Sequence, residues 1–211
     1  MKGPAVAEGA EPEADGSGGG VLPGPDGRLR CPWGRSGDYL AYHDEEWGRP
    51  VRGETVLYER FTLEAFQSGL SWLTILRKRE GFRSAFDGFD ADVVARYGDA
   101  DVARLLADAR IVRNRAKIDA AIANARAVVT LRETYDGGLD SLVWSFAPDG
   151  ATRPAPRVLG DVPARTPEST ALAKTLKRHG FVFVGPTTAY AAMQACGLVN
   201  DHLADCVARN G

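Results

Sequence analysis

Apolar residues recur at helical spacing through most of the chain beyond residue 54. They fall three or four positions apart over 100–109, and again over 115–134. Each of these segments therefore carries one apolar face, which is typical of helices that pack on a core. Gly137 and Gly138 follow the second segment and are expected to end it. The pattern predicts two amphipathic helices, with Asp99 opening the first.

Residues that favour helix starts and ends delimit further helices. Ser71 is a suitable N-cap, and Gly69 is expected to end the preceding helix in a left-handed turn. The further predicted helices are 55–68, 71–78, one from Thr166 or Ser169 to Arg178, 187–196, and a short helix carrying His202 and Cys206. Only 181–184 has a strand-like pattern, and one isolated run cannot form a sheet. The predicted fold class is all-α.

The first 28 residues differ in composition from the rest. They are rich in Gly, Pro, Ala and Glu, and they carry a net charge of −3. Such a segment buries too little apolar surface to offset the entropy of ordering it. We therefore expect a disordered acidic tail over 1–28 and a single helical domain over 29–211. The irregular stretch 148–167 holds five of the twelve prolines and is expected to be a loop.

Composition and charge exclude several classes of protein. No apolar run approaches the ~18 residues of a membrane span, and the N-terminus lacks the features of a signal peptide, so we expect a cytoplasmic protein. Three cysteines are too few for a disulfide framework. The net charge of −2 does not favour nucleic-acid binding, yet residues 29–211 carry about +1 and contain basic clusters near 77–83, 110–117 and 174–178. Such clusters contact phosphates in some proteins and are solvated helix faces in others.

Two cysteines and two histidines form a candidate metal site. On a helix, His202 and Cys206 would share a face because they are four residues apart. Cys31 and His43 would complete a tetrahedral Cys2His2 set from the other end of the domain. The twelve-residue spacing of that second pair lies outside compact zinc-finger patterns. The alternative is a small buried Cys206 and an ordinary surface histidine at position 43.

A polar stripe runs along the predicted helix 55–68 and into the next turn. Its members, Glu64, Gln67, Ser68 and Ser71, are spaced three to four residues apart. In one interpretation the helix faces solvent and Glu64 pairs with Arg60. In the other, Glu64 and Gln67 line a pocket beside Trp72, where a carboxylate and a flat indole would hold a purine base. A cluster of upstream aromatic residues fits either a base pocket or a minor hydrophobic core: Trp33, Tyr39, Tyr42 and Trp47.

Residues 105–117 join two predicted helices through a short turn that is followed by basic residues. Helix-hairpin-helix modules bind DNA by presenting turn amides and a helix N-terminus to a phosphate. Ordinary helical hairpins share this layout, and the turn here lacks glycine, with Arg110 at the position where one is expected. The segment alone does not distinguish the two.

Taken together, these segments resemble 3-methyladenine DNA glycosylase I, the Tag family. The resemblance rests on AYHDEEWGRP at 41–50, LEAFQSGLSWLTILRKREGFR at 63–83, RIVRNRAKIDAAIANARA at 110–127, VWSF at 143–146 and LKRHGFVFVGPTTAYAAMQACGLVNDHLADC at 176–206. It implies an all-α helix-hairpin-helix DNA glycosylase fold in which one structural Zn²⁺ links the N- and C-terminal segments. The departures are Arg110 in the hairpin, a spacing between Cys31 and Tyr39 that is one residue short, and a C-terminus soon after Cys206.

The resemblance also assigns roles to residues of this sequence. The implied metal ligands are Cys31, His43, His202 and Cys206; the implied base-site residues are Glu64, Trp72, Tyr42, Tyr39 and Trp33, with Gln67 shaping the pocket; and the implied DNA contacts are Gly69, Leu70, Arg113, Arg115 and Lys117. We expect Trp72 to stack on a flipped base and an anionic Glu64 to favour the cationic lesion over neutral adenine.

The expected activity is hydrolytic excision of 3-methyladenine from double-stranded alkylated DNA. No lysine occupies an obvious nucleophile position, so we expect a monofunctional, monomeric glycosylase that uses no redox or nucleotide cofactor and acts on the bacterial nucleoid. Two alternatives remain: a zinc-stapled helical module without catalysis, and a glycosylase acting mainly on 3-methylguanine or another purine.

Overall fold

The structure, a computed structural model, describes residues 19–150 and 153–210, so most of the expected tail lies outside the described residues. Its elements are β1 (Leu22–Pro23), β2 (Leu29–Arg30), η1 (Pro32–Gly34), α1 (Tyr39–Ala41), η2 (Tyr42–Glu46), α2 (Glu54–Gln67), α3 (Trp72–Ala85), η3 (Asp87–Phe89), α4 (Ala91–Val94), α5 (Asp99–Ala107), α6 (Arg115–Thr134), α7 (Gly138–Trp144), η5 (Leu159–Asp161), α8 (Pro167–Arg178), α9 (Pro186–Ala195) and η6 (Val207–Arg209). Most of the described chain is helical, in agreement with the predicted class.

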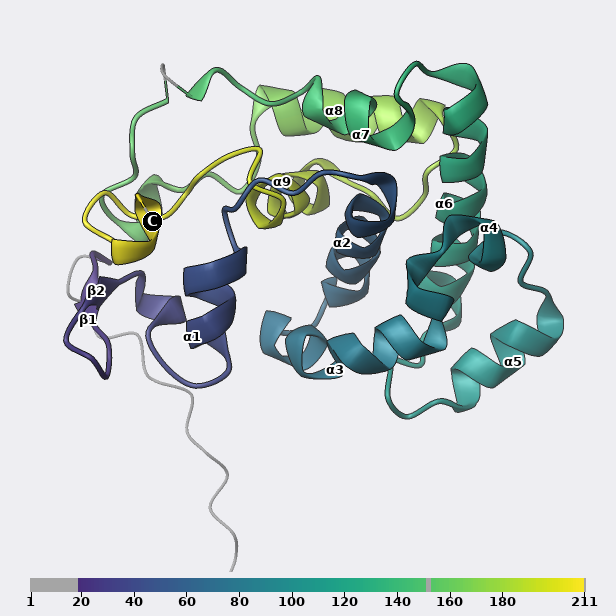
Figure 1. Cartoon of the computed structure of the whole chain (residues 1–211), viewed down its shortest axis with the longest axis horizontal. Coiled ribbons are helices and arrows are strands. Elements are labelled where there is room, and N and C mark those ends of the chain that lie inside the picture. The colour runs from purple at the N-terminus through teal and green to yellow at the C-terminus, as the bar shows by residue number, and fades with distance from the viewer. Residues whose placement is uncertain (1–18, 151–152, 211) are drawn as a thin grey trace, which may run out of the picture.

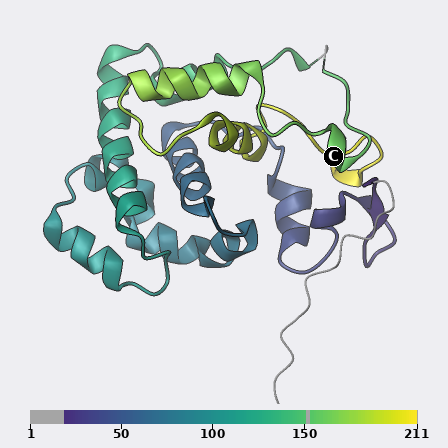
Figure 2. The ribbon, with the colours of Figure 1, turned by 180° about the vertical axis from the view of Figure 1, so that it is seen from behind.

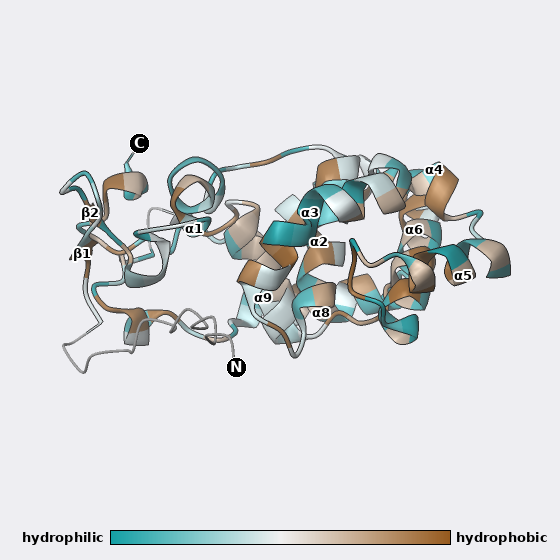
Figure 3. Cartoon of the chain, turned by 90° about the horizontal axis from the view of Figure 1, so that it is seen from below, coloured by the Kyte–Doolittle hydropathy of each residue, from teal (hydrophilic) through white to brown (hydrophobic). Residues whose placement is uncertain are grey.

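Helix α2 lies at the centre of the molecule, with α6, α7 and α9 packed around it (Figure 1). Its core side chains are fully buried, and Tyr58 also donates a hydrogen bond from its hydroxyl to the carbonyl of Ala121 on α6, at 2.9 Å. Figure 3 shows the apolar residues of α2, α6 and α9 where these helices meet, whereas α3 and α5 display many hydrophilic residues. None of the helices in the described ranges is long and apolar enough to cross a bilayer.

Capping residues set the helix boundaries largely where the sequence predicted them. Ser71 accepts a hydrogen bond from the backbone of Thr74 and begins α3, and Gly69 has φ +80°, the left-handed value expected after α2. Asn114 caps α6 by accepting from the backbone of Lys117 at 3.1 Å. Thr166 caps α8 in the same way. Two short helices were not predicted, α4 and α7.

Three expectations about local structure were wrong. Residues 22–30, placed in the tail, include an antiparallel pairing of β1 with β2. The run 181–184 is a loop rather than a strand. His202 and Cys206 lie in a turn rather than a helix, where Arg209 donates side-chain hydrogen bonds to the carbonyls of Asn200 and His202. These contacts satisfy carbonyl groups that an α-helix would have paired internally.

The N- and C-terminal segments of the described chain lie together at one end of the molecule, away from α4 and α5 (Figures 1 and 2). There η2 contacts η6, and β2 also contacts η6. The small core of this end contains Cys31, Leu203, Cys206 and Ala208, with Val21 and Trp33 packed against it. It is separate from the main apolar core of the helices.

Candidate metal centre and base site

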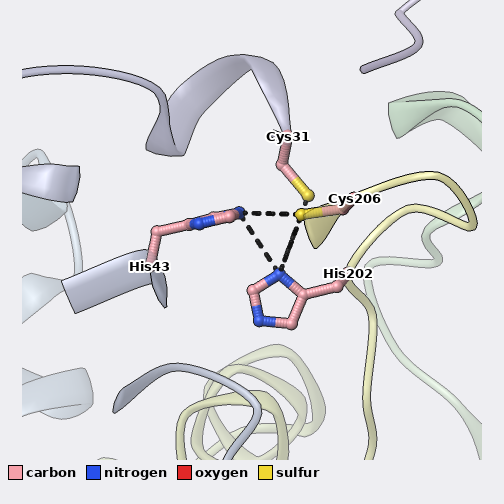
Figure 4. Close-up of side chains that lie close together, drawn as sticks. All are labelled: Cys31, His43, His202 and Cys206. Atoms are coloured by element: carbon pink, nitrogen blue, oxygen red, sulfur yellow. Dashed lines mark hydrogen bonds between the residues drawn. The ribbon is translucent and has the colours of Figure 1, made fainter. Parts of the chain in front are cut away.

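The structure brings the four predicted metal ligands together. Cys31 precedes η1, His43 belongs to η2, and the other two residues come from the turn before η6. All four side chains are buried, and their ligand atoms lie within 4.8 Å of one another (Figure 4). The alternative of a surface histidine at position 43 is therefore wrong. The cluster joins segments about 170 residues apart in sequence.

The distances between the ligand atoms fit a tetrahedral metal ion. The gap between His43 Nε2 and His202 Nδ1 is 3.2 Å, and Cys206 Sγ lies 3.5 Å and 3.7 Å from the same two atoms. Cys31 Sγ is 3.9 Å from His202 Nδ1. Bond lengths of about 2.0 Å to nitrogen and 2.3 Å to sulfur in a tetrahedron give ligand–ligand distances of roughly 3.3–3.8 Å. The donor set therefore suits a metal without rearrangement.

Neighbouring groups fix the orientation of both histidine rings. His43 Nδ1 lies 2.7 Å from a carboxylate oxygen of Asp44, and His202 Nε2 lies 2.9 Å from the carbonyl of Trp47. These contacts leave the other ring nitrogen of each histidine facing the cluster, as metal-binding histidines require. Hydrogen bonds from Cys31, His202 and His43 lower the pKa of the Cys206 thiol, so the cluster favours a thiolate.

An aromatic cluster connects the metal centre to the base site. Trp33 contacts Tyr39, Tyr42, His43 and Trp47, with ring centroids 4.9–6.4 Å apart. Tyr42 in turn faces Trp72 at 5.3 Å, with the rings tilted by 42°. The Tyr42–Trp72 pair belongs to two segments, η2 and the start of α3. Trp33 and Tyr39 lie one step further out, beside Tyr42 and the metal ligands.

Glu64 lies in the interior, close to this aromatic pair. Its side chain is 7% exposed, so the solvent-facing interpretation of the polar stripe is wrong at this position. Burial raises the pKa of the Glu64 carboxyl to about 8, and the charge of Arg60 lowers it only in part. The free protein therefore holds Glu64 largely protonated at neutral pH, in contrast to the anion expected from sequence. Gln67 is half-buried, and Ser68 and Ser71 are exposed.

A buried carboxylate that the sequence analysis missed holds the base-site elements together. Glu46, at the end of η2, accepts hydrogen bonds from Arg60 of α2 at 2.9 Å and from Arg79 of α3 at 2.6 Å and 2.9 Å. These ion pairs join η2, which carries Tyr42, to the helices that carry Glu64 and Trp72. They lower the pKa of Glu46 despite its partial burial.

Several buried donors surround the site without a partner. Nε and Nη1 of Arg60 and Nε1 of Trp72 have no hydrogen-bond partner within the described part of the chain. A cleft of about 340 Å³ lies beside Tyr42 and Glu46; its other lining residues are Asp38, Ala41, Leu76, Arg77 and Arg79. Charged residues in a run of aromatics were the only sequence signal for Arg60 and Glu46, since their partners are 14 and 33 residues away.

The turn between α2 and α3 is anchored from below by Lys117. The lysine is 7% exposed, and its Nζ donates to the carbonyls of Phe66 and Ser68 at 2.9 Å and 2.5 Å. A direct phosphate contact by this side chain was expected, and the structure corrects it because the ammonium points inward. It supports the turn that carries Gly69 and Leu70, whose side chain is 42% exposed.

The α5–α6 hairpin forms its turn without glycine. Within the described residues, the non-glycine positions with positive φ are Asp87, Phe89 and Phe183, so Arg110 is not strained in this way. Asp108 accepts from both the backbone and the guanidinium of Arg110, at 2.8–3.2 Å, and stabilises the turn. Arg113 and Arg115 are exposed beside it, and Arg115 also pairs with Asp119 at 3.1 Å.

The fold and the site define a mostly helical protein in which a Cys2His2 cluster lies beside a buried carboxyl and an aromatic pair. A family model described as methyladenine glycosylase matches residues 33–210. The chain is 46% identical to DNA-3-methyladenine glycosylase 1 of Escherichia coli K12 over 178 residues, which cover 84% of this chain and 95% of the relative. The corresponding glycosylase of Haemophilus influenzae is 42% identical over 84% of this chain and 96% of its own length.

Solved structures give the same assignment. A crystal structure of 3-methyladenine DNA glycosylase I superposes with a TM-score of 0.78 at 45% identity and covers 84% of this chain and 98% of that one. The Staphylococcus aureus enzyme, studied for 3-methyladenine recognition, superposes at 0.77 with 33% identity, over 83% of this chain and 93% of its own. The chain belongs to the methyladenine glycosylase family.

Proposed function

We propose that the chain flips 3-methyladenine out of double-stranded alkylated DNA and hydrolyses its N-glycosidic bond, as a monofunctional enzyme of base excision repair. The observation that carries this proposal is the buried carboxyl of Glu64 beside the Tyr42–Trp72 pair. A flat cationic base suits that combination of an aromatic surface and an acceptor group. The names of the relatives, which specify 3-methyladenine, support the same substrate.

The chemistry demands little of the enzyme because N3-methylation leaves adenine cationic. Water adds to the sugar carbon as the glycosidic bond breaks, the bonding electrons neutralise the departing base, and a proton from the water passes to solvent. In this proposal Trp72 and Tyr42 hold the ring, and Glu64 accepts hydrogen bonds from its edge. A cation entering the pocket favours ionisation of Glu64, so binding of the lesion creates the anion that selects it. Gln67 lines the pocket, while Tyr39 and Trp33 support Tyr42.

The Cys/His cluster is proposed to hold one structural Zn²⁺. Cys31, His43, His202 and Cys206 would supply four protein ligands, and no position would be left for a catalytic water. The ion would tie the N- and C-terminal segments together, and no redox or nucleotide cofactor is needed for the hydrolysis. The role of these residues in catalysis is therefore to fix Tyr42 through the aromatic cluster.

The DNA is proposed to bind across the α2–α3 turn and the α5–α6 hairpin, used as a helix-hairpin-helix. Gly69 and Leu70 would enter the duplex beside the flipped nucleotide, and Arg113 and Arg115 would contact the backbone phosphates. Both arginines are exposed, which fits this role. We propose a monomer that acts in the cytoplasm, where the DNA of its bacterial relatives lies.

Release of bases from methylated duplex DNA tests the proposal. The purified protein is expected to release 3-methyladenine and to leave the strand intact until alkali cleaves the abasic site. Release mainly of 3-methylguanine would assign a different substrate range. A protein that binds the duplex but releases no base would be a binding module. Glu64→Gln, which keeps the shape of the side chain, is the matched control for hydrolysis by this site.

A further inference from the structure

Two apolar side chains project from the loop between α8 and α9. Val182 and Phe183 are 45% and 41% exposed, whereas the flanking Phe181 and Val184 are buried. Phe183 also has φ +58°, a left-handed conformation that is costly for a bulky residue. Backbone strain of this kind persists only where the surrounding structure enforces it, and it clusters at functional sites.

Asn124 of α6 enforces the shape of this loop. Its side chain is 4% exposed, accepts a hydrogen bond from the backbone of Val182 at 2.8 Å and donates one to the carbonyl of the same residue at 3.2 Å. Figure 2 shows the loop running from the end of α8 past α6 to the start of α9. The loop therefore holds Phe183 in a strained conformation on a rigid helix, with much of its ring in solvent.

The same side of α6 supports the Leu70 turn. Lys117, which holds that turn, precedes Asn124 by seven residues, so the two side chains project from one face of the helix. Seven residues span about 10 Å along a helix axis. That distance corresponds to about three base steps of a DNA strand. Two anchored turns with exposed apolar side chains, Leu70 and Phe183, thus lie along one side of α6.

The charge around the loop suits a polyanion. Residues 169–200 contain no Asp or Glu, and Lys174, Lys177 and Arg178 on α8 are exposed immediately before the loop. An apolar tip next to cations, without nearby carboxylates, fits a DNA backbone with its sugars and base edges. We propose that the Val182–Phe183 loop is a second DNA contact, which packs against the duplex about three base steps from the flipped nucleotide. This inference rests on the proposed function, which places the lesion beside Leu70.

Binding of a duplex that contains a tetrahydrofuran abasic analogue tests the contact without requiring base release. Fluorescence anisotropy would compare the parent with Phe183→Ala, Phe183→Gly and the control Leu159→Ala, which truncates an equally exposed apolar residue elsewhere. Both Phe183 variants are expected to bind the duplex about 10-fold more weakly, the loss of one aromatic contact with DNA. Affinity for free 3-methyladenine, measured by calorimetry, is expected to stay within twofold of the parent.

Thermal unfolding separates this role from a structural one. Glycine adopts positive φ without strain, so Phe183→Gly is expected to keep or raise the melting temperature while losing duplex affinity. Duplex affinities within twofold of the parent for both variants would overturn the contact, as would an equal loss in Leu159→Ala or a parent that does not bind duplex. A parent that binds the abasic duplex but releases no 3-methyladenine would overturn the proposed function alone, because the anisotropy comparison does not depend on hydrolysis.

Discussion

The two ends of this molecule are held together by different forces. The helical body from α2 to α9 packs around a continuous apolar core that includes large fully buried residues such as Tyr58 and Phe66. The other end has four buried core residues, two of which are cysteines of the metal centre. Its order rests on polar links: the Cys/His cluster and the ion pairs of Arg30 with Asp26 and Asp44. Since Tyr42 belongs to this end and Trp72 to the other, the base site depends on both.

Loss of a metal ligand is expected to have the largest effect and to act on one end only. Cys206→Ser should reduce bound zinc below about half an equivalent and abolish excision, because structural zinc contributes on the order of 10 kcal/mol to folding of the segments it joins. Hydrogen exchange should show lost protection over 29–47 and 200–209, with protection of α2 and α6 retained. Cys196→Ser, at a buried cysteine outside the cluster, is the matched control.

Two outcomes would break the comparison. Uniform loss of protection across both ends would mean that the helical body also depends on the cluster. A Cys206→Ser protein with normal excision and little zinc would mean that the apolar contacts of Trp33 and Leu203 suffice to hold the aromatic segment.

The ease of prediction also differs between the two ends. The start of α3 at Ser71, the turn at Gly69 and the bounds of α6 followed from the sequence because caps and apolar periodicity act over a few residues. The ligand set was also found, since few residue types bind metals. The helix expected at His202 was wrong because Arg209, seven residues away, pairs with the carbonyl groups of this turn.

Ion pairs and burial between distant segments were beyond local patterns. Glu46 meets Arg60 and Arg79 only because η2, α2 and α3 converge in space. Lys117 was expected at the surface on account of its charge. The structure buries it because carbonyls at the C-terminal end of α2 accept its three-donor ammonium group. A lysine in an apolar helix face thus had two possible environments that spacing alone could not separate.

Glu64→Gln is expected to have the second largest effect, on the base site itself. Excision should fall about 100-fold, as for other losses of one electrostatic contact in an active site. In the parent, kcat/KM should rise with pH toward about 8, where free Glu64 ionises, and the variant should lack this limb. A parent profile that is flat from pH 6 to 9 would contradict the assignment of the anion to Glu64.

The same substitution makes a stability prediction with a defined sign. Folded Glu64 keeps its proton up to a pKa of about 8, whereas the unfolded chain releases it near 4.5. The parent therefore loses stability as pH rises between these values, and Gln lacks that loss, which could reach about 4 kcal/mol. Urea unfolding at pH 5 and pH 8 should show the variant gaining on the parent at the higher pH. An equal difference at both values would mean that burial of the carboxyl is not the cause.

The smallest expected effect concerns the packed end. Lys117→Met removes the hydrogen bonds to Phe66 and Ser68 while keeping most of the apolar length of the side chain, so the free energy of unfolding should fall by about 1–3 kcal/mol. Lys174→Met, on the exposed side of α8, should change it by less than about 0.5 kcal/mol. Because Lys117 supports the Leu70 turn and does not point to solvent, duplex affinity should fall without a change in its salt dependence. A reduced salt slope would instead show that Lys117 pairs with a phosphate, since each phosphate neutralised contributes about one counterion to that slope.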